Sequence, residues 1–96
     1  MHIKPNTDNK RPSYDFVAID FETATGHLYS ACSVGIVTVS DGIITDEYQA
    51  FFQPPYNEYW YGNIMIHGIT PEMTEDLPGF HAVYPEVRER LSGKIV

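Results

Sequence analysis

The stretch VAIDFETAT at residues 17–25 decides how the rest of the chain is read, because a short apolar run there ends in two carboxylates. Alternate side chains of a β-strand point to opposite faces, so we expect Asp20 and Glu22 on one face and Phe21 on the other. At about 3.3 Å of rise per residue, their Cα atoms would lie roughly 6.6 Å apart. Two carboxylates at that spacing repel each other unless a cation lies between them, and Mg²⁺ prefers such oxygen ligands. The stretch therefore predicts half of a two-metal, phosphodiester-cleaving site.

An Asp-x-Glu pair also occurs by chance on solvated strand edges, where it binds nothing. The flanking sequence favours a metal site, because residues 16–19 are apolar on both faces of the expected strand. Such a strand is expected to be central in its sheet and covered on both sides. Carboxylates at its end would then lie at the rim of the sheet, where α/β proteins bind their ligands.

The composition is that of one small globular domain, with 96 residues of which 43% are hydrophobic. No apolar stretch approaches the roughly 20 residues of a membrane span, and the polar N-terminus lacks the apolar centre of a signal peptide. The single cysteine, Cys32, excludes an internal disulfide framework, and its apolar surroundings predict a buried small hydrophobe. These features predict a cytoplasmic protein without a membrane partner.

The formal net charge of −7 argues against a protein that binds nucleic acid broadly through positive charge. It does not argue against a metal-dependent nuclease, because bound cations would cancel the carboxylates and meet the phosphate locally. The acidity does predict weak binding to long nucleic acid.

Local signals divide the chain into strands, a hairpin and helices. The expected elements are strands over residues 14–21, 31–39 and 43–52, a loop over 53–62, a short apolar stretch over 63–69, a helical turn over 71–75 and the main helix over 80–91. The pair Asp41-Gly42 between apolar runs predicts a tight hairpin. In the third strand, alternation places Ile44, Tyr48, Ala50 and Phe52 on one face, with Asp46 interrupting it.

The main helix is expected to present one apolar face, formed by Phe80, Val83, Val87 and Leu91. Pro85 predicts either a kink or a regular helix that begins near residue 84. Lys94-Ile95-Val96 begins a new apolar run, so the sequence is expected to be cut within a fourth strand.

The order of these features closely resembles the first half of the DEDD exonucleases. Asp20-Phe21-Glu22-Thr23 is similar to the first exonuclease motif of that family, and Ile66-His67-Gly68-Ile69-Thr70 is similar to a second landmark about 45 residues downstream. The branch that the second motif favours is the histidine type, which includes the proofreading epsilon subunit of bacterial DNA polymerase III.

This resemblance implies an α/β, ribonuclease-H-like fold, here a truncated one. It would hold a three-stranded antiparallel or mixed sheet, one main helix and the start of a fourth strand. Residues 1–13 would form a flexible arm, and residues 14–96 would form the N-terminal half of the exonuclease domain. The implied activity is 3′→5′ hydrolysis at a single-stranded nucleic-acid 3′ end. A DNA polymerase subunit is one partner that the resemblance allows; a free-standing enzyme and one domain of a helicase-linked protein are the alternatives.

The resemblance also implies roles for four residues. Asp20 would bridge two Mg²⁺ or Mn²⁺ ions, and Glu22 would bind the ion that activates water. The backbone of Thr23 would lie near the 3′-hydroxyl, and His67 would lie beside the terminal nucleotide. The family's other two aspartates and its histidine base have no match here and are expected beyond Val96. We therefore expect the 96-residue chain alone to be inactive.

Other interpretations remain open. The chain could be a non-catalytic ribonuclease-H-like module that self-associates or binds a partner through exposed strand edges, or a nucleotide-binding fragment that needs no metal. His67 could be a loop histidine bonded to backbone. The aromatic residues of the 53–62 loop could stack on bases. The absence of basic residues there instead favours rings that cover the core. Asp46 and Arg90 are expected to be solvated.

Overall fold

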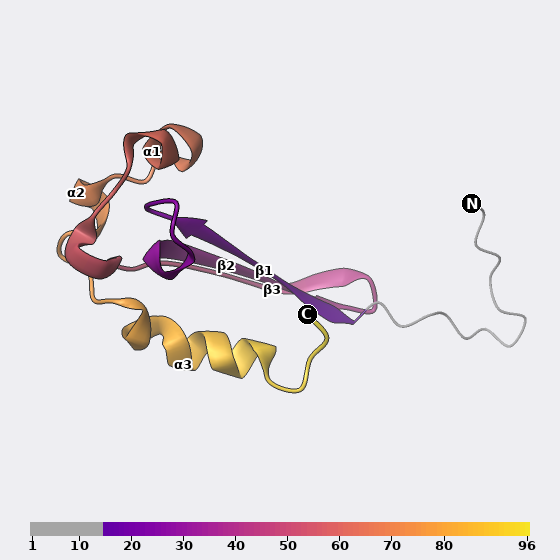
Figure 1. Ribbon diagram of the computed structural model, residues 1–96. Helices are drawn as coiled ribbons and strands as arrows, with labels where there is room; N and C mark the ends of the chain where they lie inside the picture. The colour runs from indigo at the N-terminus through magenta and orange to yellow at the C-terminus, as the bar shows by residue number, and fades with distance from the viewer. Residues whose placement is uncertain (1–14) are drawn as a thin grey trace, which may run out of the picture.

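The computed structural model describes residues 15–96, so the arm expected at residues 1–13 lies outside the described residues. The elements in chain order are β1 (Phe16–Thr23), η1 (Leu28–Ser30), β2 (Ala31–Ser40), β3 (Ile43–Phe51), η2 (Pro55–Asn57), α1 (Tyr61–His67), α2 (Pro71–Thr74) and α3 (Phe80–Leu91). The strands form one sheet, α3 lies along one of its faces, and α1 and α2 gather at the end where β1 stops (Figure 1).

The sheet has the strand order β1-β2-β3, and both pairs of neighbours are antiparallel. The central strand is therefore β2, and the prediction that β1 is central and covered on both sides is wrong. On β1 only one face is covered, since Val17 is buried while Phe16 and Ala18 are exposed. An antiparallel sheet can leave one face open to solvent, so apolar residues on both faces of a strand did not establish its place in the sheet.

The hairpin between β2 and β3 forms as predicted, with Asp41 and Gly42 at φ values of 53° and 76°. Both values are positive, as a two-residue turn of type I′ requires. Next to the turn, a β-bulge shifts the register, since Thr38 pairs with Asp46 but Val39 pairs with Ile44. The bulge adds one residue to β3 and so reverses its alternation. Ile44 consequently lies on the open face, and its predicted place beside Tyr48 is wrong.

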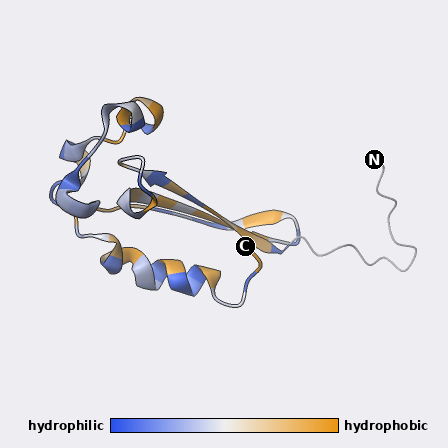
Figure 2. Cartoon of the chain, in the orientation of Figure 1, coloured by the Kyte–Doolittle hydropathy of each residue, from blue (hydrophilic) through white to orange (hydrophobic). Residues whose placement is uncertain are grey.

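The main core lies between the sheet and α3. Its buried residues are Val17, Val34, Ile36, Phe52 and Val87, and the expected helix residues Phe80, Val83 and Leu91 pack against them. The bounds of α3 are those predicted, and the helix continues through Pro85. Hydrophobic and hydrophilic residues alternate along α3, as expected of a helix with one face on a sheet (Figure 2).

Asp46 is not simply solvated, because it lies on the face of the sheet that α3 covers. The guanidinium of Arg90 on α3 donates to Asp46 Oδ2 at 3.1 Å, and it lies 4.1 Å from the centre of the Tyr48 ring. Arg90 is partly buried, so its predicted solvation is wrong, whereas Asp46 is exposed as predicted and also accepts this bond. Asp46, which breaks the apolar pattern of β3, therefore makes a specific contact between this strand and α3.

One helix was not expected. Residues 61–67 form α1, where the sequence suggested the end of a loop and an apolar stretch. Its apolar residues follow one another at 64–66 and are mostly exposed, so they lack the 3.6-residue period that marks a helix against a core. Gly68, at a φ of 74°, ends the helix, and this glycine was a usable signal.

The last residues return to the outer edge of β1, where the Val17 N–H donates to the Ile95 carbonyl at 2.8 Å. Backbone pairing beyond β1 therefore begins where the fourth strand was expected, although no regular strand forms there. None of the helices within residues 15–96 has the length and hydropathy that crossing a membrane requires.

Candidate metal and nucleic-acid site

The two carboxylates of β1 lie on the face of the sheet away from α3. Asp20 pairs with Gly35 of β2 and Glu22 pairs with Ser33, while Phe21 between them points to the other face and contacts Phe80 at 6.1 Å between ring centroids. An added Cβ at Gly35 would meet no atom within 4 Å, so the space beside Asp20 is open. The same-face arrangement expected from the strand period is therefore present, on a surface that solvent reaches.

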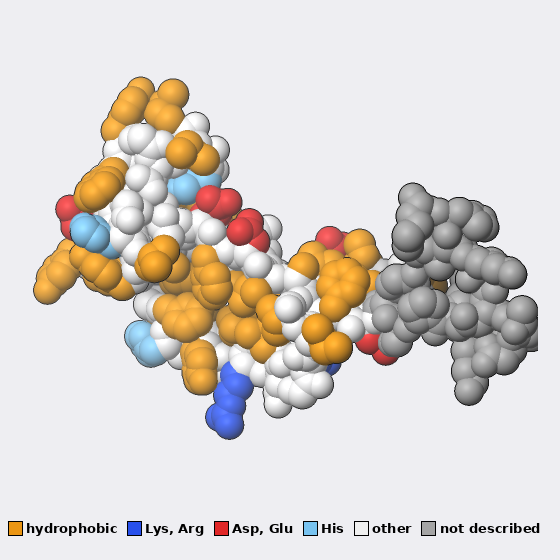
Figure 3. Space-filling view, turned by 45° about the vertical axis from the view of Figure 1, so that its right-hand side comes forward, with side chains coloured by type: hydrophobic (Ala, Val, Ile, Leu, Met, Phe, Trp, Pro, Cys, Tyr) orange, Lys and Arg blue, Asp and Glu red, His pale blue; other side chains and the backbone are white. Residues whose placement is uncertain are grey.

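Nothing positive neutralises this pair within the described residues. The ion pairs found in residues 15–96 join Arg90 to Asp46 and to Glu86, both away from the site. The sequence holds no lysine or arginine between Arg11 and Arg88. Acidic side chains lie close together near a histidine in the hollow between the sheet and the short helices (Figure 3). The pair therefore has unmatched negative charge available to a cation.

The donor set suits a hard cation but is small. Mg²⁺ is commonly held by one or two carboxylates together with substrate phosphate oxygens and water, so Asp20 and Glu22 fit it. Within residues 15–96, no three His, Cys, Asp or Glu side chains come together as a metal site would need. Two carboxylates on one strand can thus supply part of a two-metal site and not all of it.

Two side chains of α1 hold the end of β1 in place. Asn63 Nδ2 donates to the carbonyls of Thr23 at 3.1 Å and Thr25 at 2.9 Å. His67 Nε2 lies 2.9 Å from the same Thr23 carbonyl, and the Ile69 N–H donates to His67 Nδ1 at 2.9 Å. Since Nδ1 accepts, the proton of the neutral ring is on Nε2, which donates to Thr23. Asn63 and His67 are four residues apart, so both lie on the face of α1 that contacts β1.

This arrangement fixes the backbone directly after Glu22, where the pairing of β1 with β2 shifts register because Cys32 of β2 has no partner on β1. Both ring nitrogens of His67 are used by backbone groups, as the interpretation of a loop histidine requires. Its contact with a nucleotide stays a prediction, which would have to use the face of the ring. Asn63 was not predicted as a site residue. The available signal was its position four residues before His67, which places both on one face of a helix.

We predict that Asn63→Ala lowers the free energy of unfolding by about 1–2 kcal/mol, because it removes the amide that donates to the carbonyls of both Thr23 and Thr25. Urea denaturation followed by circular dichroism measures the change. Met65→Ala on the exposed face of the same helix is the control and should change it by less than about 0.5 kcal/mol. Equal effects of the two variants would show that Asn63 contributes helix content and not the contact with β1.

A second small core supports the loop after β1. It is formed by Ala24, Cys32 and Ile69, with Tyr59 packed against them. Cys32 is fully buried as predicted, and burial raises the pKa of its thiol. Burial also raises the pKa of Tyr59 to about 12. Neither group therefore ionises readily near neutral pH, and both act as packing residues.

The Tyr59 hydroxyl belongs to a short chain of hydrogen bonds. Thr74 Oγ1 donates to Asn57 Oδ1 at 2.8 Å, so the Tyr59 hydroxyl, 2.7 Å from Thr74 Oγ1, is the donor in that pair. Among the aromatic residues of residues 53–62, only Tyr59 covers a core as expected. Tyr56 and Tyr61 are exposed, so that prediction is wrong for them. Trp60 is also partly exposed and lies edge-on to His27, with ring centroids 5.4 Å apart.

Comparison with known proteins supports the fold. No protein-family model and no curated protein sequence matches the chain. Among solved structures, the chain is similar to Exonuclease X in complex with 5′ overhanging duplex DNA, with a TM-score of 0.65 and 23% sequence identity. The similar region covers 83% of this chain and 55% of the Exonuclease X chain. This chain therefore spans about half the length of Exonuclease X. The predicted α/β, ribonuclease-H-like fold is confirmed.

Proposed function

We propose that residues 14–96 are the N-terminal half of a metal-dependent 3′→5′ exonuclease domain. The observation that carries this proposal is the position of Asp20 and Glu22, on one open face of β1 with no cation paired to them among residues 15–96. The similarity in fold to an exonuclease supports the same conclusion. The substrate we propose is the 3′ end of a single-stranded nucleic acid. We propose that the protein acts in the cytoplasm and that its partner is a DNA polymerase subunit.

In this proposal, Asp20 would be a ligand shared by two divalent cations, and Glu22 would be a ligand of one of them. Mg²⁺ or Mn²⁺ at such a site lowers the pKa of bound water and stabilises the charge that develops on the phosphate. The backbone of Thr23 lies near the terminal 3′-hydroxyl, and Asn63 and His67 keep that backbone in place from α1. The ring of His67 lies beside the terminal nucleotide. The remaining carboxylates and the general base come from outside residues 15–96.

Calorimetric titration of the chain with Mn²⁺ tests whether the pair binds a cation. We expect Asp20→Asn and Glu22→Gln each to weaken binding about tenfold or more, since each removes one of two charged ligands. Asp41→Asn in the hairpin turn is the control, because it removes the same charge far along the sheet. A loss of affinity in Asp41→Asn as large as in Asp20→Asn would mean that Mn²⁺ follows net charge and not this pair.

A second candidate, the non-catalytic interaction module, is favoured by the outer edge of β1. The N–H groups of Ile19 and Phe21 point to the same side as that of Val17, because they lie two and four residues further along the strand. Within residues 15–96, only Val17 finds a backbone partner on that side. Unpaired edges recruit other strands. A stable monomer in light scattering at high concentration would count against this function.

A further inference from the structure

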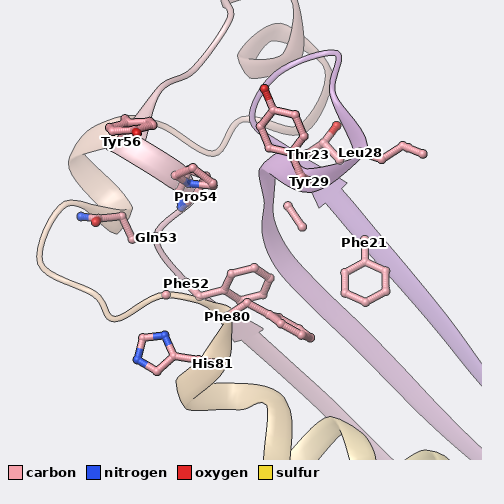
Figure 4. Close-up of a pocket in the computed structure, with 13 residues that line it drawn as sticks. Phe21, Thr23, Leu28, Tyr29, Phe52, Gln53, Pro54, Tyr56, Phe80 and His81 are labelled. Carbon is pink, nitrogen blue, oxygen red and sulfur yellow. The ribbon is translucent and has the colours of Figure 1, made fainter.

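A cavity of about 830 Å³ opens on the α3 side of the sheet, opposite the face that carries Asp20 and Glu22. Phe21, Phe52 and Phe80 form its base, and the Phe52 and Phe80 rings meet edge-on with centroids 5.1 Å apart. Leu28 of η1 and Tyr56 of η2 stand at its rim (Figure 4). The cavity is therefore built from four separate segments of the chain, and of the residues in the proposed catalytic function only Thr23 lines it.

The lining selects an apolar ligand. No Asp, Glu, Lys or Arg side chain lines the cavity. The uncharged polar groups in the lining belong to Thr23, Gln53, His81 and two tyrosines, and the Gln53 amide already donates to the Glu75 carbonyl at 2.9 Å. Leu28 is 92% exposed and Tyr56 is 99% exposed. Large apolar side chains gathered around a hollow of this size are typical of a binding site, since such sites span about 300–1,000 Å³.

The charge around the cavity selects the kind of partner. The Gln53 amide bond to Glu75 and the Gln53 N–H bond to the Pro78 carbonyl place the acidic segment Glu75-Asp76 beside the rim. No lysine or arginine lines the cavity, and His81 at the start of α3 is the basic side chain in its lining. A nucleic acid would bring its negative charge next to the acidic segment with no lysine or arginine in the lining to pair with it. A positively charged peptide would be attracted by the same segment.

We propose that this cavity docks a segment of a partner protein whose apolar side chains, aromatic or leucine, are flanked by lysine or arginine. The apolar side chains fill the hollow over Phe52 and Phe80, and the basic residues meet the acidic rim. The volume accommodates more than one side chain, so a short segment with adjacent anchors fits. This docking is independent of whether Asp20 and Glu22 bind metal.

Fluorescence anisotropy of labelled peptides with the full 96-residue chain tests the proposal. The probe is Lys-Arg-Phe-Leu-Phe-Arg-Lys. The comparison peptides replace its basic residues with Glu and Asp, or its apolar centre with Ser-Gly-Ser. We expect each comparison peptide to bind at least about tenfold more weakly than the probe. Leu28→Ser and Tyr56→Asn should each weaken probe binding by about tenfold; asparagine suits the positive φ of 58° at Tyr56.

Ile66→Ser is the matched control, since Ile66 is an equally exposed apolar residue on α1 that does not line the cavity. Probe binding that is unchanged in Ile66→Ser and weakened in the two cavity variants supports the docking site. Three results would each overturn it: no binding of the probe at millimolar concentration, equal weakening in all three variants, or competition by a thymidine octanucleotide, which would assign the cavity to nucleic acid.

Discussion

The 96-residue chain by itself is expected to leave a 5′-labelled single-stranded oligonucleotide intact in the presence of Mn²⁺. Phosphodiester hydrolysis by two metals needs both ions held about 3.5–4 Å apart, with a base to deprotonate the attacking water. The described residues bring together two carboxylates on β1 and no third ligand. Neither metal position is then complete, so a denaturing gel should show no ladder of shortened products.

Protein expressed from the whole reading frame that contains these residues is expected to ladder the same substrate from its 3′ end. Asp20→Ala should lower that rate by at least about two orders of magnitude. Changes to residues that only support a metal ligand already cost about 10–100-fold, and Asp20 is the proposed ligand itself. Asp41→Asn is the control for lost charge and should keep the rate, since asparagine suits the positive φ of 53° at this position.

Two gel results would contradict this account. Laddering by the 96-residue chain that disappears in Asp20→Ala would show that two carboxylates suffice. Laddering by the whole protein that persists in Asp20→Ala would place the active site elsewhere.

The features that the sequence predicted well are local ones. The period of two in β1 placed Asp20 and Glu22 on one face, Asp41-Gly42 predicted the turn, and the period of the apolar residues predicted the bounds of α3. Each of these depends on residues within one turn, one strand or one helix, where local geometry restricts the backbone and sets the direction of the side chains.

The features that the sequence did not predict depend on contacts between distant segments. The edge position of β1 is set by which strand pairs with which, and its own residues do not encode that. The contact of Asp46 with Arg90 joins residues 44 positions apart and cannot be seen in either element alone. The bulge after Thr38 is a change of register, which a regular alternation cannot anticipate.

The same distinction applies to the candidate site. The carboxylates follow from a motif of three residues, whereas the support of that motif comes from Asn63, 40 positions beyond the Thr23 that it holds. α1 was missed because its apolar residues do not face a core, yet this short helix is what positions Asn63 and His67. The motif therefore predicted the two carboxylates. Only the three-dimensional arrangement revealed that side chains of α1 hold the backbone that follows them.

Phe52→Ala is expected to destabilise the chain by about 3–5 kcal/mol, the cost of removing a large buried aromatic side chain. Phe52 is 1% exposed, packs edge-on against Phe80, and fixes the exit from β3 through the bond from its N–H to the Cys32 carbonyl at 2.9 Å. The free energy of unfolding of a native domain is about 5–15 kcal/mol, and a domain of this length lies toward the lower end of that range. A substantial fraction of the variant should therefore be unfolded at 25 °C.

Urea denaturation followed by circular dichroism measures this loss, and the neighbouring residue provides the control. Phe51 has the same side chain but points to the open face and is 39% exposed, so Phe51→Ala should cost less than about 1.5 kcal/mol. The two variants remove identical atoms one position apart, so the difference between them reports burial against α3. Equal costs would mean that the open face of the sheet is covered in solution, as face-to-face packing of two copies of the chain would require.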